Sequence, residues 1–402
     1  MRPLHVLVVP SWYTTFFDAT SGIFFKEQAL ALKEHGVRVA IAFPQMAPFR
    51  PWSRALFRQY HYQTSWAEED GLLTGRVFGW NFLPRMWGRF WVWSASYLVR
   101  RYIRRYGRPD LIHAQGTLWA GCAARELASL AIPYVVTEQT SAIHDNQFSA
   151  WEVAQARRAL RQADRVIACS SPLADLLRER DLAVPQQLRV VPYTVDTSFF
   201  VLPPEAPPPR PFRFLVVGYL APCKRVNLAL EAFVRAFPDD PDVELVVGGD
   251  GVLRTALEEL TRSLPGNRRI KFLGALSRQQ VRETMWRSHA LVLPSPYETF
   301  GCVVIEALAC GLPVLATSRG GPADTITAEV GIHQVTDDAS VLAEAMVRMR
   351  RLHARYAPQA LRHRAVAHFS RPVVARQLVE VFEEAARPAA GTVDRGAWRR
   401  CA

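Results

Sequence analysis

Two glutamates flank the start of a predicted helix in the second half of the chain. The stretch 291–317 reads as a strand, a turn, a helix and a second strand, with Glu298 before the helix and Glu306 within it. The residues at the predicted start of this helix are Phe300, Gly301 and Cys302. Unpaired backbone N–H groups and the helix dipole make such an end a binding site for phosphate, and glycine lets a ligand approach the backbone closely.

The two carboxylates indicate that the ligand carries more than phosphate. A carboxylate repels phosphate but accepts hydrogen bonds from both hydroxyls of a cis-diol. A diphosphate with a sugar on each side suits the whole arrangement, and a nucleotide-sugar is such a ligand. The alternative for Glu306 is a solvated helix carboxylate, but its apolar neighbours favour a buried acid that binds a ligand. These neighbours are Val304, Ile305, Ala307 and Leu308.

Short apolar runs alternate with helix-length amphipathic segments throughout the first half of the chain. Strands that are buried on both faces read as continuous apolar runs, so this pattern predicts a parallel sheet with helices between its strands. The predicted strands are 5–10, 37–43, 110–114, 133–138, 164–170 and 189–193.

A proline-rich segment separates two such units. Six prolines lie between 203 and 211, a density that excludes regular structure and predicts a linker. The alternating pattern then restarts, with predicted strands at 212–218, 243–251, 270–274, 289–294 and 312–317. We predict doubly wound α/β domains at 1–202 and 212–369. Beyond Val335 we expect two helical segments, the last at about 370–388 with apolar residues at helical spacing.

The order of the motifs along nearly the whole chain resembles that of the retaining GT-B glycosyltransferases of family 4, the glycosyl transferases group 1. The two acids match the E-x7-E signature of that family. The accompanying motifs are GIFFKEQALAL, PDLIHAQG, PYVVTEQTS, ADRVIACS and VPYTVD, then GYLAPCKRVNLALEAF, VELVVGGDG, IKFLG and GGPADTI. The resemblance implies two Rossmann-like domains facing across a cleft, with a C-terminal helix that crosses back to the first.

The resemblance also implies roles for particular residues. Glu306 would bind the ribose of the donor, Glu298 the hydroxyls of its sugar, and Lys224 the diphosphate. Gly22 would face the phosphates from the first domain. Lys224 in isolation is an ordinary loop lysine, and Gly22 has the alternative of serving only a turn. The base would lie near Phe272 to Ala275 and the Gly248–Gly249 turn.

Two positions depart from the family pattern. Tyr219 stands where the family often has a phosphate-binding arginine, and we consider Arg225, beside Lys224, as its replacement in the donor site. Gln139 stands in place of a histidine, and an amide cannot act as a base. These replacements would affect how tightly the donor phosphates are held and how fast the enzyme turns over.

Transfer in the family is described as same-face attack, with the leaving phosphate accepting the proton of the acceptor. Such a scheme needs no enzymic nucleophile, so Glu298 and Lys224 are the predicted catalytic residues, acting by positioning and by charge stabilisation. We expect no essential metal, because no Asp-x-Asp follows a strand, and no cofactor besides the nucleotide-sugar co-substrate. On the acceptor side, the candidates are His113, Gln139 and His144, with a structural role for His113 left open.

The charge of the chain points to an anionic partner. Its formal net charge is +12, and aromatic and basic residues mix in the stretches 49–66 and 86–108. The second stretch can be a core helix, with Trp87, Phe90, Trp91, Leu98 and Tyr102 inside. We also predict peripheral contact of the first domain with anionic membrane, or a groove for a lipid-linked acceptor.

Other sequence features bear on location. The first apolar run is too short for a signal peptide, and no segment is long enough to span a bilayer. The six cysteines are scattered, which fits a reduced setting. We expect a cytoplasmic protein, peripheral to the membrane, with a glycan or lipid-linked acceptor and a role in cell-surface polysaccharide or glycolipid synthesis.

Several alternatives remain. A nucleotide-sugar epimerase or a phosphorylase has a comparable architecture, and a non-catalytic donor-binding scaffold is compatible with Tyr219 and Gln139. A dinucleotide-dependent oxidoreductase lacks support, because no G-x-G-x-x-G follows the first strand. Nucleic-acid binding is suggested only by charge, and no recognition module accompanies it.

Overall fold

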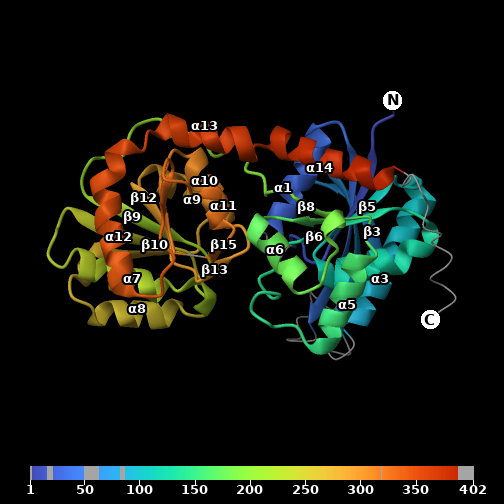
Figure 1. Cartoon of the computed structure of the whole chain (residues 1–402), viewed down its shortest axis with the longest axis horizontal. Coiled ribbons are helices and arrows are strands. Elements are labelled where there is room, and N and C mark those ends of the chain that lie inside the picture. The colour runs from blue at the N-terminus through green and yellow to red at the C-terminus, as the bar shows by residue number, and fades with distance from the viewer. Residues whose placement is uncertain (1, 16–20, 49–62, 82–86, 318, 388–402) are drawn as a thin grey trace.

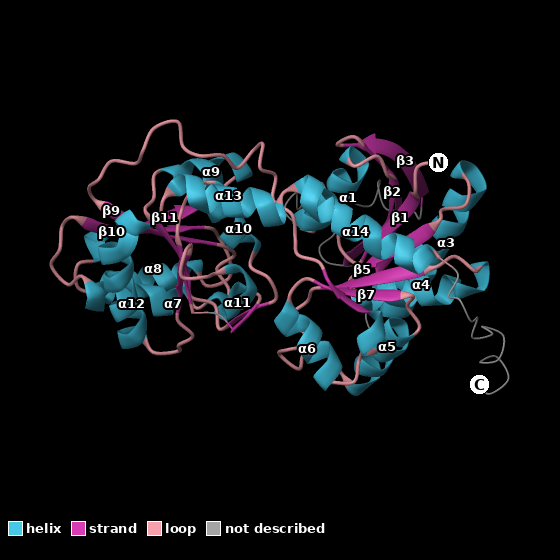
Figure 2. Cartoon of the chain, turned by 45° about the horizontal axis from the view of Figure 1, so that its top comes forward, coloured by secondary structure: helices cyan, strands magenta, loops and turns pink. Residues whose placement is uncertain are grey.

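The computed structural model describes residues 2–15, 21–48, 63–81, 87–317 and 319–387. These residues form two α/β units side by side, each built around its own sheet (Figures 1 and 2). Within these ranges, no helix is long and apolar enough to cross a bilayer.

The first unit is built on an eight-stranded sheet in the order β3-β4-β2-β1-β5-β6-β7-β8. Its strands are β1 (His5–Pro10), β2 (Arg38–Pro48), β3 (Gln63–Glu69), β4 (Leu72–Asn81), β5 (Leu111–Gln115), β6 (Tyr134–Glu138), β7 (Arg165–Ala168) and β8 (Leu188–Val190). All neighbours pair in parallel except β3, which runs antiparallel to β4 at the edge. Every residue of β1, β5 and β6 is buried, which explains why these strands read as continuous apolar runs.

The helices of this unit connect its parallel strands. They are α1 (Ile23–Glu34), α3 (Trp87–Tyr106), α4 (Cys122–Glu126), α5 (Ala150–Arg161) and α6 (Ser171–Glu179). A capping box starts α5, in which the Ser149 side chain accepts from the backbone N–H of Glu152 and the Glu152 carboxylate accepts from the backbone N–H of Ser149.

The apolar face of α3 is core, with one correction. Trp91, Leu98 and Tyr102 are buried against the sheet, as predicted. Phe90 is 36% exposed, so its predicted place on the buried face is wrong. The buried stripe runs through 91, 95, 98 and 102, and a helix turns about 100° per residue, which carries position 90 out of that stripe.

The sequence patterns did not predict the β3–β4 hairpin. Its turn is Asp70–Gly71, and both residues have positive φ, 51° and 79°. This is the dipeptide that favours a tight hairpin, and it was the available signal. Residues 49–62 of the predicted basic and aromatic stretch lie outside the described residues.

The second unit is built on a six-stranded parallel sheet in the order β11-β10-β9-β12-β14-β16. Its strands are β9 (Phe212–Val217), β10 (Val243–Gly248), β11 (Ile270–Gly274), β12 (Ala290–Leu293), β14 (Val314–Ala316) and β16 (Gly331–His333). Two short strands, β13 (Tyr297–Glu298) and β15 (Arg319–Gly320), form a separate pair. The helices are α7 (Val226–Ala236), α8 (Arg254–Ser263), α9 (Arg278–Trp286), α10 (Cys302–Ala309), α11 (Pro322–Thr325), α12 (Ala339–Leu352) and α13 (Pro358–Phe369).

The last described helix, α14 (Arg371–Ala386), returns to the first unit. It follows α13 along the top of the molecule and packs on α1 (Figure 1). Its predicted apolar residues Val374, Leu378 and Phe382 are all fully buried. After His333 the described chain forms three helices, where we predicted two segments. The two units, doubly wound and bridged by α14, form the GT-B-like fold that the motif order implied.

Candidate active site

The strand order of the second sheet reverses between β9 and β12. The chain runs from β9 outward through β10 to β11, then returns to place β12 on the other side of β9. In open α/β sheets, ligands bind in the crevice outside the carboxyl ends of the strands at such a point. Lys224 follows β9 and Glu298 follows β12, so the topology brings both residues to this crevice.

Lys224 and Glu298 form an ion pair. Lys224 Nζ donates to Glu298 Oε1 at 2.6 Å, and Ser295 Oγ donates to the same oxygen at 2.7 Å. Burial alone would lower the pKa of Lys224, but the Glu298 carboxylate outweighs burial and raises that pKa above its usual value. Lys224 therefore remains charged. An ammonium group has three N–H donors, so Lys224 can hold Glu298 and an anion together.

Cys302, the first residue of α10, lies among the charged groups. Burial is the main reason that the pKa of its thiol is raised, and the charges of Glu306, Glu298 and Lys224 also act on it. Gly301 precedes it with φ 84°, a left-handed conformation that glycine adopts without strain. The amino end of α10, the lysine and both glutamates therefore share one region.

Glu306 lies further along α10 and is partly buried. Burial raises the pKa of its carboxyl group to about 7, the charge of Arg278 opposes this shift and the charge of Glu27 adds to it. No hydrogen-bond partner for this carboxylate occurs among the described residues. Its oxygens are thus able to accept hydrogen bonds from the hydroxyls of a ligand.

Gly22 begins α1 with φ 66°. A Cβ atom at this position would lie 2.8 Å from the Trp12 carbonyl oxygen and 2.9 Å from Tyr13 Cα. The local backbone therefore requires glycine here, so the turn before α1 is by itself enough to explain this residue. A contact between Gly22 and donor phosphates stays a prediction.

The loop that carries Glu298 contacts the first unit at two points. Ser170 Oγ, before α6, donates to the Thr299 carbonyl oxygen at 2.6 Å. The His144 ring stacks on the Tyr297 ring, with centroids 3.7 Å apart and planes 9° apart. His144, a candidate for the acceptor side, is therefore next to the residue that precedes Glu298.

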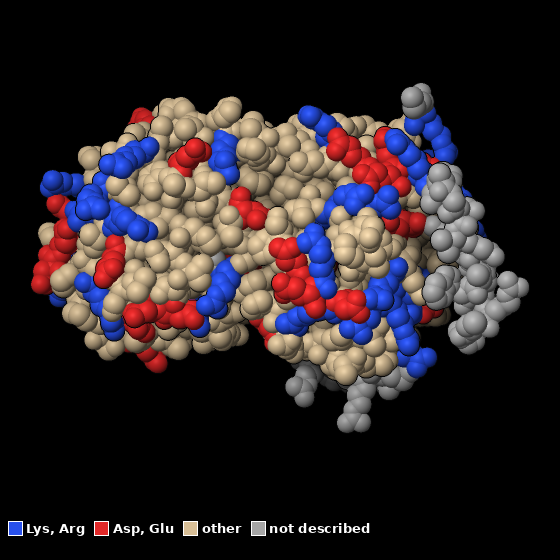
Figure 3. Space-filling model, viewed as in Figure 1, with Lys and Arg blue, Asp and Glu red and all other residues tan. Residues whose placement is uncertain are grey.

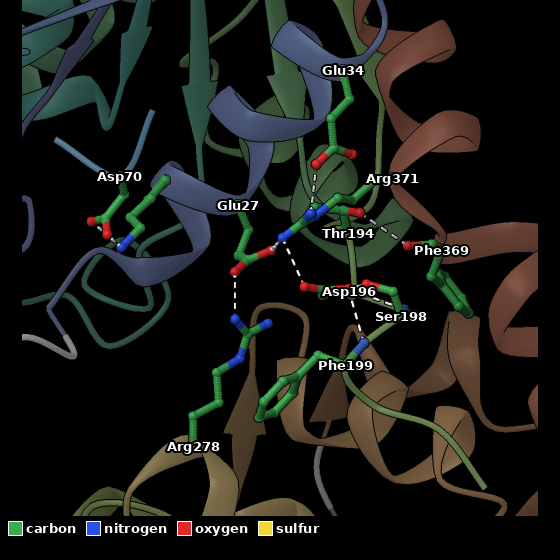
Figure 4. A network of polar contacts seen from close by, with 11 residues as sticks. Glu27, Glu34, Asp70, Thr194, Asp196, Ser198, Phe199, Arg278, Phe369 and Arg371 are labelled. Carbon is green, nitrogen blue, oxygen red and sulfur yellow. Dashed lines mark hydrogen bonds and ion pairs between the residues drawn. The ribbon is translucent and has the colours of Figure 1, made fainter. Parts of the chain in front are cut away.

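A charged network at the junction of the two units was not predicted (Figure 4). The Glu27 carboxylate on α1 accepts from Arg278 on α9 at 2.8 Å and from Arg371 at the start of α14 at 2.7 Å. Arg371 also pairs with Asp196 at 2.9 Å and with Glu34 at 2.7 Å. Glu27 is 6% exposed, so this network is largely shielded from water. In the sequence four of these are ordinary charged helix residues and Asp196 is a loop residue, and no local signal reveals their contact.

The side chains of two predicted donor-site residues have partners within the protein. Arg225 forms an ion pair with Asp337, and its contact with the donor in place of the missing arginine stays a prediction. The Phe300 ring is 2% exposed and packs edge-on against Tyr193 at 5.3 Å and against Phe369. The Phe300 ring therefore packs in the core, whereas the predicted role of Phe300 concerns its backbone N–H at the start of α10 and stays a prediction.

Two predicted acceptor-side residues are also buried. His113 has no exposed surface, lies against Phe382 of α14, and shares a 2.7 Å hydrogen bond with Thr137. Burial lowers the pKa of His113 to about 3, so its ring is neutral and structural. Gln139 is 5% exposed and its amide oxygen accepts from the Tyr193 hydroxyl. Of the three candidates, His144 is the one that meets the second unit.

The arrangement supplies positive charge, backbone N–H groups and two carboxyl groups at a sheet switch point. Within the described residues, no group of three or more His, Cys, Asp or Glu side chains is placed to hold a metal ion.

Two family models match the chain. Residues 22–199 match the model described as Glycosyltransferase Family 4, and residues 202–358 match the model described as Glycosyl transferases group 1. Together they cover both α/β units.

Curated relatives agree with these models. The chain is 28% identical over 294 residues to glycogen synthase of Mycobacterium tuberculosis, which covers 70% of each protein. It is 28% identical over 162 residues to the gpi3 subunit of phosphatidylinositol N-acetylglucosaminyltransferase of Schizosaccharomyces pombe, over 40% of this chain and 36% of the relative.

Solved structures share the fold. Sucrose-phosphate synthase from Thermosynechococcus elongatus superposes with a TM-score of 0.73 at 21% identity, covering 94% of this chain and 98% of that one. Anabaena HepE in complex with UDP-glucose superposes with a TM-score of 0.71 at 17% identity, covering 94% and 99%. With both halves matched by glycosyltransferase models and the whole described by a GT-B fold, the chain belongs to the family 4 glycosyltransferases.

Proposed function

We propose that this glycosyltransferase moves a sugar from a nucleotide-sugar to a hydroxyl of a glycan or lipid-linked acceptor, with retention of anomeric configuration. The observation that supports this most is the 2.6 Å pair of Lys224 and Glu298 near Cys302 at the amino end of α10, with Glu306 one turn along the same helix. A single ligand with sugar, diphosphate and ribose matches that grouping.

In this proposal each group has a physical task. Glu306 accepts hydrogen bonds from the ribose hydroxyls, and Glu298 accepts them from the donor sugar. Lys224 and the N–H groups of α10 stabilise negative charge as the diphosphate departs. Glu298 also holds Lys224 in place through their 2.6 Å contact, so it contributes to orientation as well as to binding.

We further propose that no metal and no additional cofactor takes part. Lys224 and the helix N–H groups supply positive charge where a divalent cation would otherwise act. Transfer that persists undiminished after dialysis against EDTA is the expected result. Activity that disappears with EDTA and returns with Mg²⁺ or Mn²⁺ would contradict this part of the proposal.

Transfer itself is tested by incubating the protein with a panel of sugar nucleotides and glycan or lipid-linked acceptors. UDP-glucose comes first, because a solved neighbour holds it. The expected outcome is a glycosylated acceptor whose new bond has the donor's anomeric configuration by NMR, and Glu298→Gln should lose this activity. Donor binding without transfer to any acceptor would favour a non-catalytic scaffold, and a changed sugar without transfer would favour an epimerase.

We propose a cytoplasmic enzyme that touches anionic membrane and acts in cell-surface polysaccharide or glycolipid synthesis. The second half of α3 exposes Arg100, Arg101, Arg104 and Arg105, which suit an anionic surface. The five cysteines in the described ranges are unpaired, which suits a reducing compartment. On the face shown in Figure 3, basic and acidic side chains are interspersed, so a local patch rather than the whole face would make the contact.

Vesicles containing phosphatidylglycerol test the membrane contact. At low salt they should retain the protein, because each arginine near an anionic surface contributes about 1 kcal/mol. The double change Arg104→Glu and Arg105→Glu should release it, whereas Arg351→Glu, an exposed site on the other unit, should not. Failure of the unchanged protein to bind such vesicles would refute the contact.

A further inference from the structure

A groove lies between three helices of the first unit, separate from the residues discussed for the donor. The first halves of α3 and α5 and the segment around α4 enclose a cavity of about 1120 Å³. Binding pockets for small molecules span roughly 300–1,000 Å³, so this one is large enough for an extended ligand. Nothing in the proposed donor site accounts for it.

The walls of the groove carry exposed aromatic rings. Trp93 on α3 is 59% exposed and Trp151 on α5 is 51% exposed. The Trp93 ring lies parallel to that of Tyr97, with centroids 5.9 Å apart. On the other wall, Trp151 lies 6.3 Å from Trp119. Leaving such large apolar rings in water is unfavourable, which points to a ligand that covers them.

Trp119 is held in the groove by an unusual backbone. Its φ is 70°, a left-handed value that is a clear outlier for a bulky side chain. Its ring fills the space beside Gly88 of α3, where an added Cβ would lie 1.9 Å from a ring carbon. The absence of a side chain at Gly88 and the strained backbone of Trp119 together place the Trp119 ring between α3 and Trp151. Backbone strain of this kind tends to persist at binding sites.

The polar side chains of the groove indicate the chemistry of the ligand. Arg89, Arg100 and Arg125 share the lining with Glu126 and Glu152, so the charges are mixed. An arginine that pairs with a neighbouring carboxylate, as Arg125 does with Glu126, is less available to an anionic lipid headgroup, and a lipid tail would leave the polar lining without partners. The buried hydroxyl of Ser96, which also lines the groove, has no hydrogen-bond partner among the described residues. A ligand rich in hydroxyl groups satisfies such a lining.

A sugar chain combines both requirements. The face of an aromatic ring is negative and attracts the polarised C–H groups of a pyranose, while the sugar hydroxyls pair with charged and polar side chains. The nearly parallel rings of Trp93 and Tyr97 on one wall, and the tilted rings of Trp119 and Trp151 on the other, offer faces to successive sugar units.

The groove is close to the junction of the two units. The loop before α5 stacks His144 on Tyr297, next to Glu298, and ends at Ser149, which lines the groove. Five positions along a chain span at most roughly 18 Å, so the groove and the cleft are within reach of one short oligosaccharide.

We propose that the groove between α3, α4 and α5 binds the non-reacting part of an oligosaccharide acceptor. This inference rests on the proposed transfer function and adds to it that the acceptor is a chain of several sugars, recognised away from the reacting hydroxyl. The groove thereby sets acceptor length, whereas Glu298, Lys224 and Glu306 set donor binding.

The test compares binding of pentasaccharides of glucose, galactose, mannose and N-acetylglucosamine with the corresponding monosaccharides, by isothermal titration calorimetry. At least one pentasaccharide should bind, and the double change Trp93→Ala and Trp151→Ala should raise its Kd about tenfold or more, because each aromatic contact contributes on the order of 1 kcal/mol. Val190→Ala, at an exposed apolar residue of the same unit outside the groove lining, should leave the Kd unchanged. Donor binding by thermal shift should be the same in all variants, which shows that they are folded and separates this test from that of the transfer function.

Three results would overturn the proposal. One is the absence of binding to every pentasaccharide, and another is equal binding by the protein with and without the two tryptophans. The third is retention on phosphatidylglycerol vesicles that the double tryptophan change abolishes while pentasaccharide binding is unaffected, since the occupant would then be a lipid surface.

Discussion

Raising the pH through neutrality changes the charge of Glu306. Mainly because of burial, the pKa of its carboxyl group is raised to about 7. About one-tenth of the molecules carry an ionised Glu306 at pH 6 and about nine-tenths at pH 8. An ionised carboxylate can accept hydrogen bonds from both ribose hydroxyls, whereas the protonated acid has lost part of this capacity. If only the ionised form binds, the apparent Kd for the donor falls about tenfold from pH 6 to pH 8.

Isothermal titration calorimetry with UDP-glucose at constant ionic strength measures this dependence. The diphosphate of a sugar nucleotide is a diester with no proton to lose in this range, so the ligand adds no slope of its own. Glu306→Gln should bind more weakly and show no pH dependence. His144→Gln, which removes an imidazole at the junction but keeps Glu306, should retain the slope. A flat or reversed profile in the unchanged protein, or an unaltered slope in Glu306→Gln, would refute the reasoning.

Three further outcomes are expected. The raised folded-state pKa of Glu306 means that its protonated form stabilises the fold at low pH and that this contribution is lost as the pH rises through about 7. In calorimetric scans at pH 8 the free energy of unfolding of Glu306→Gln should therefore exceed that of the unchanged protein by at most about 3 kcal/mol, and the two should be equally stable below about pH 4.5. Glu27→Gln should lower the free energy of unfolding in urea by about 3 kcal/mol, because it leaves Arg278 without its buried partner. Asp70→Asn, which breaks an exposed pair between Lys26 of the same helix α1 and the β3–β4 turn, should cost less than about 1 kcal/mol. Lys224→Ala should lower kcat/KM for transfer by about 100- to 1000-fold, and a smaller loss than tenfold would exclude the proposed charge stabilisation.

The strands that build both sheets were predictable because most are buried on both faces. Continuous apolar runs such as Val6–Val9 mark them without ambiguity. The sequence patterns did not predict the edge hairpin of β3 and β4, because the exposed strand β3 mixes polar and apolar residues. They did not predict β16 because it is only three residues long. Strand order, which creates the switch point beside Lys224 and Glu298, depends on how helices pack across the sheet, and local pattern does not encode it.

That Lys224, Glu298 and Glu306 lie in one region was predictable from the sequence, but their contacts were not. The spacing of Glu298 and Glu306 around a helix start indicated the ligand class, and the position of Lys224 came from the resemblance. The ion pair of Arg225 with Asp337 and the burial of the Phe300 ring were not predictable, because neighbours in the sequence can point to opposite sides of a loop or into the core. The Glu27–Arg371 pair joins residues 344 positions apart, and charged residues on a helix surface look alike whether they face water or another unit.

A crystal structure of the protein with UDP-glucose, or with the sugar nucleotide that stabilises it most, tests the shared donor site most directly. The structure should show the ribose hydroxyls within hydrogen-bond distance of Glu306, the diphosphate between Lys224 and the amino end of α10, and the sugar beside Glu298. A nucleotide bound elsewhere would contradict the account. So would a complex in which the ribose does not contact Glu306 and no phosphate lies near the Lys224–Glu298 pair.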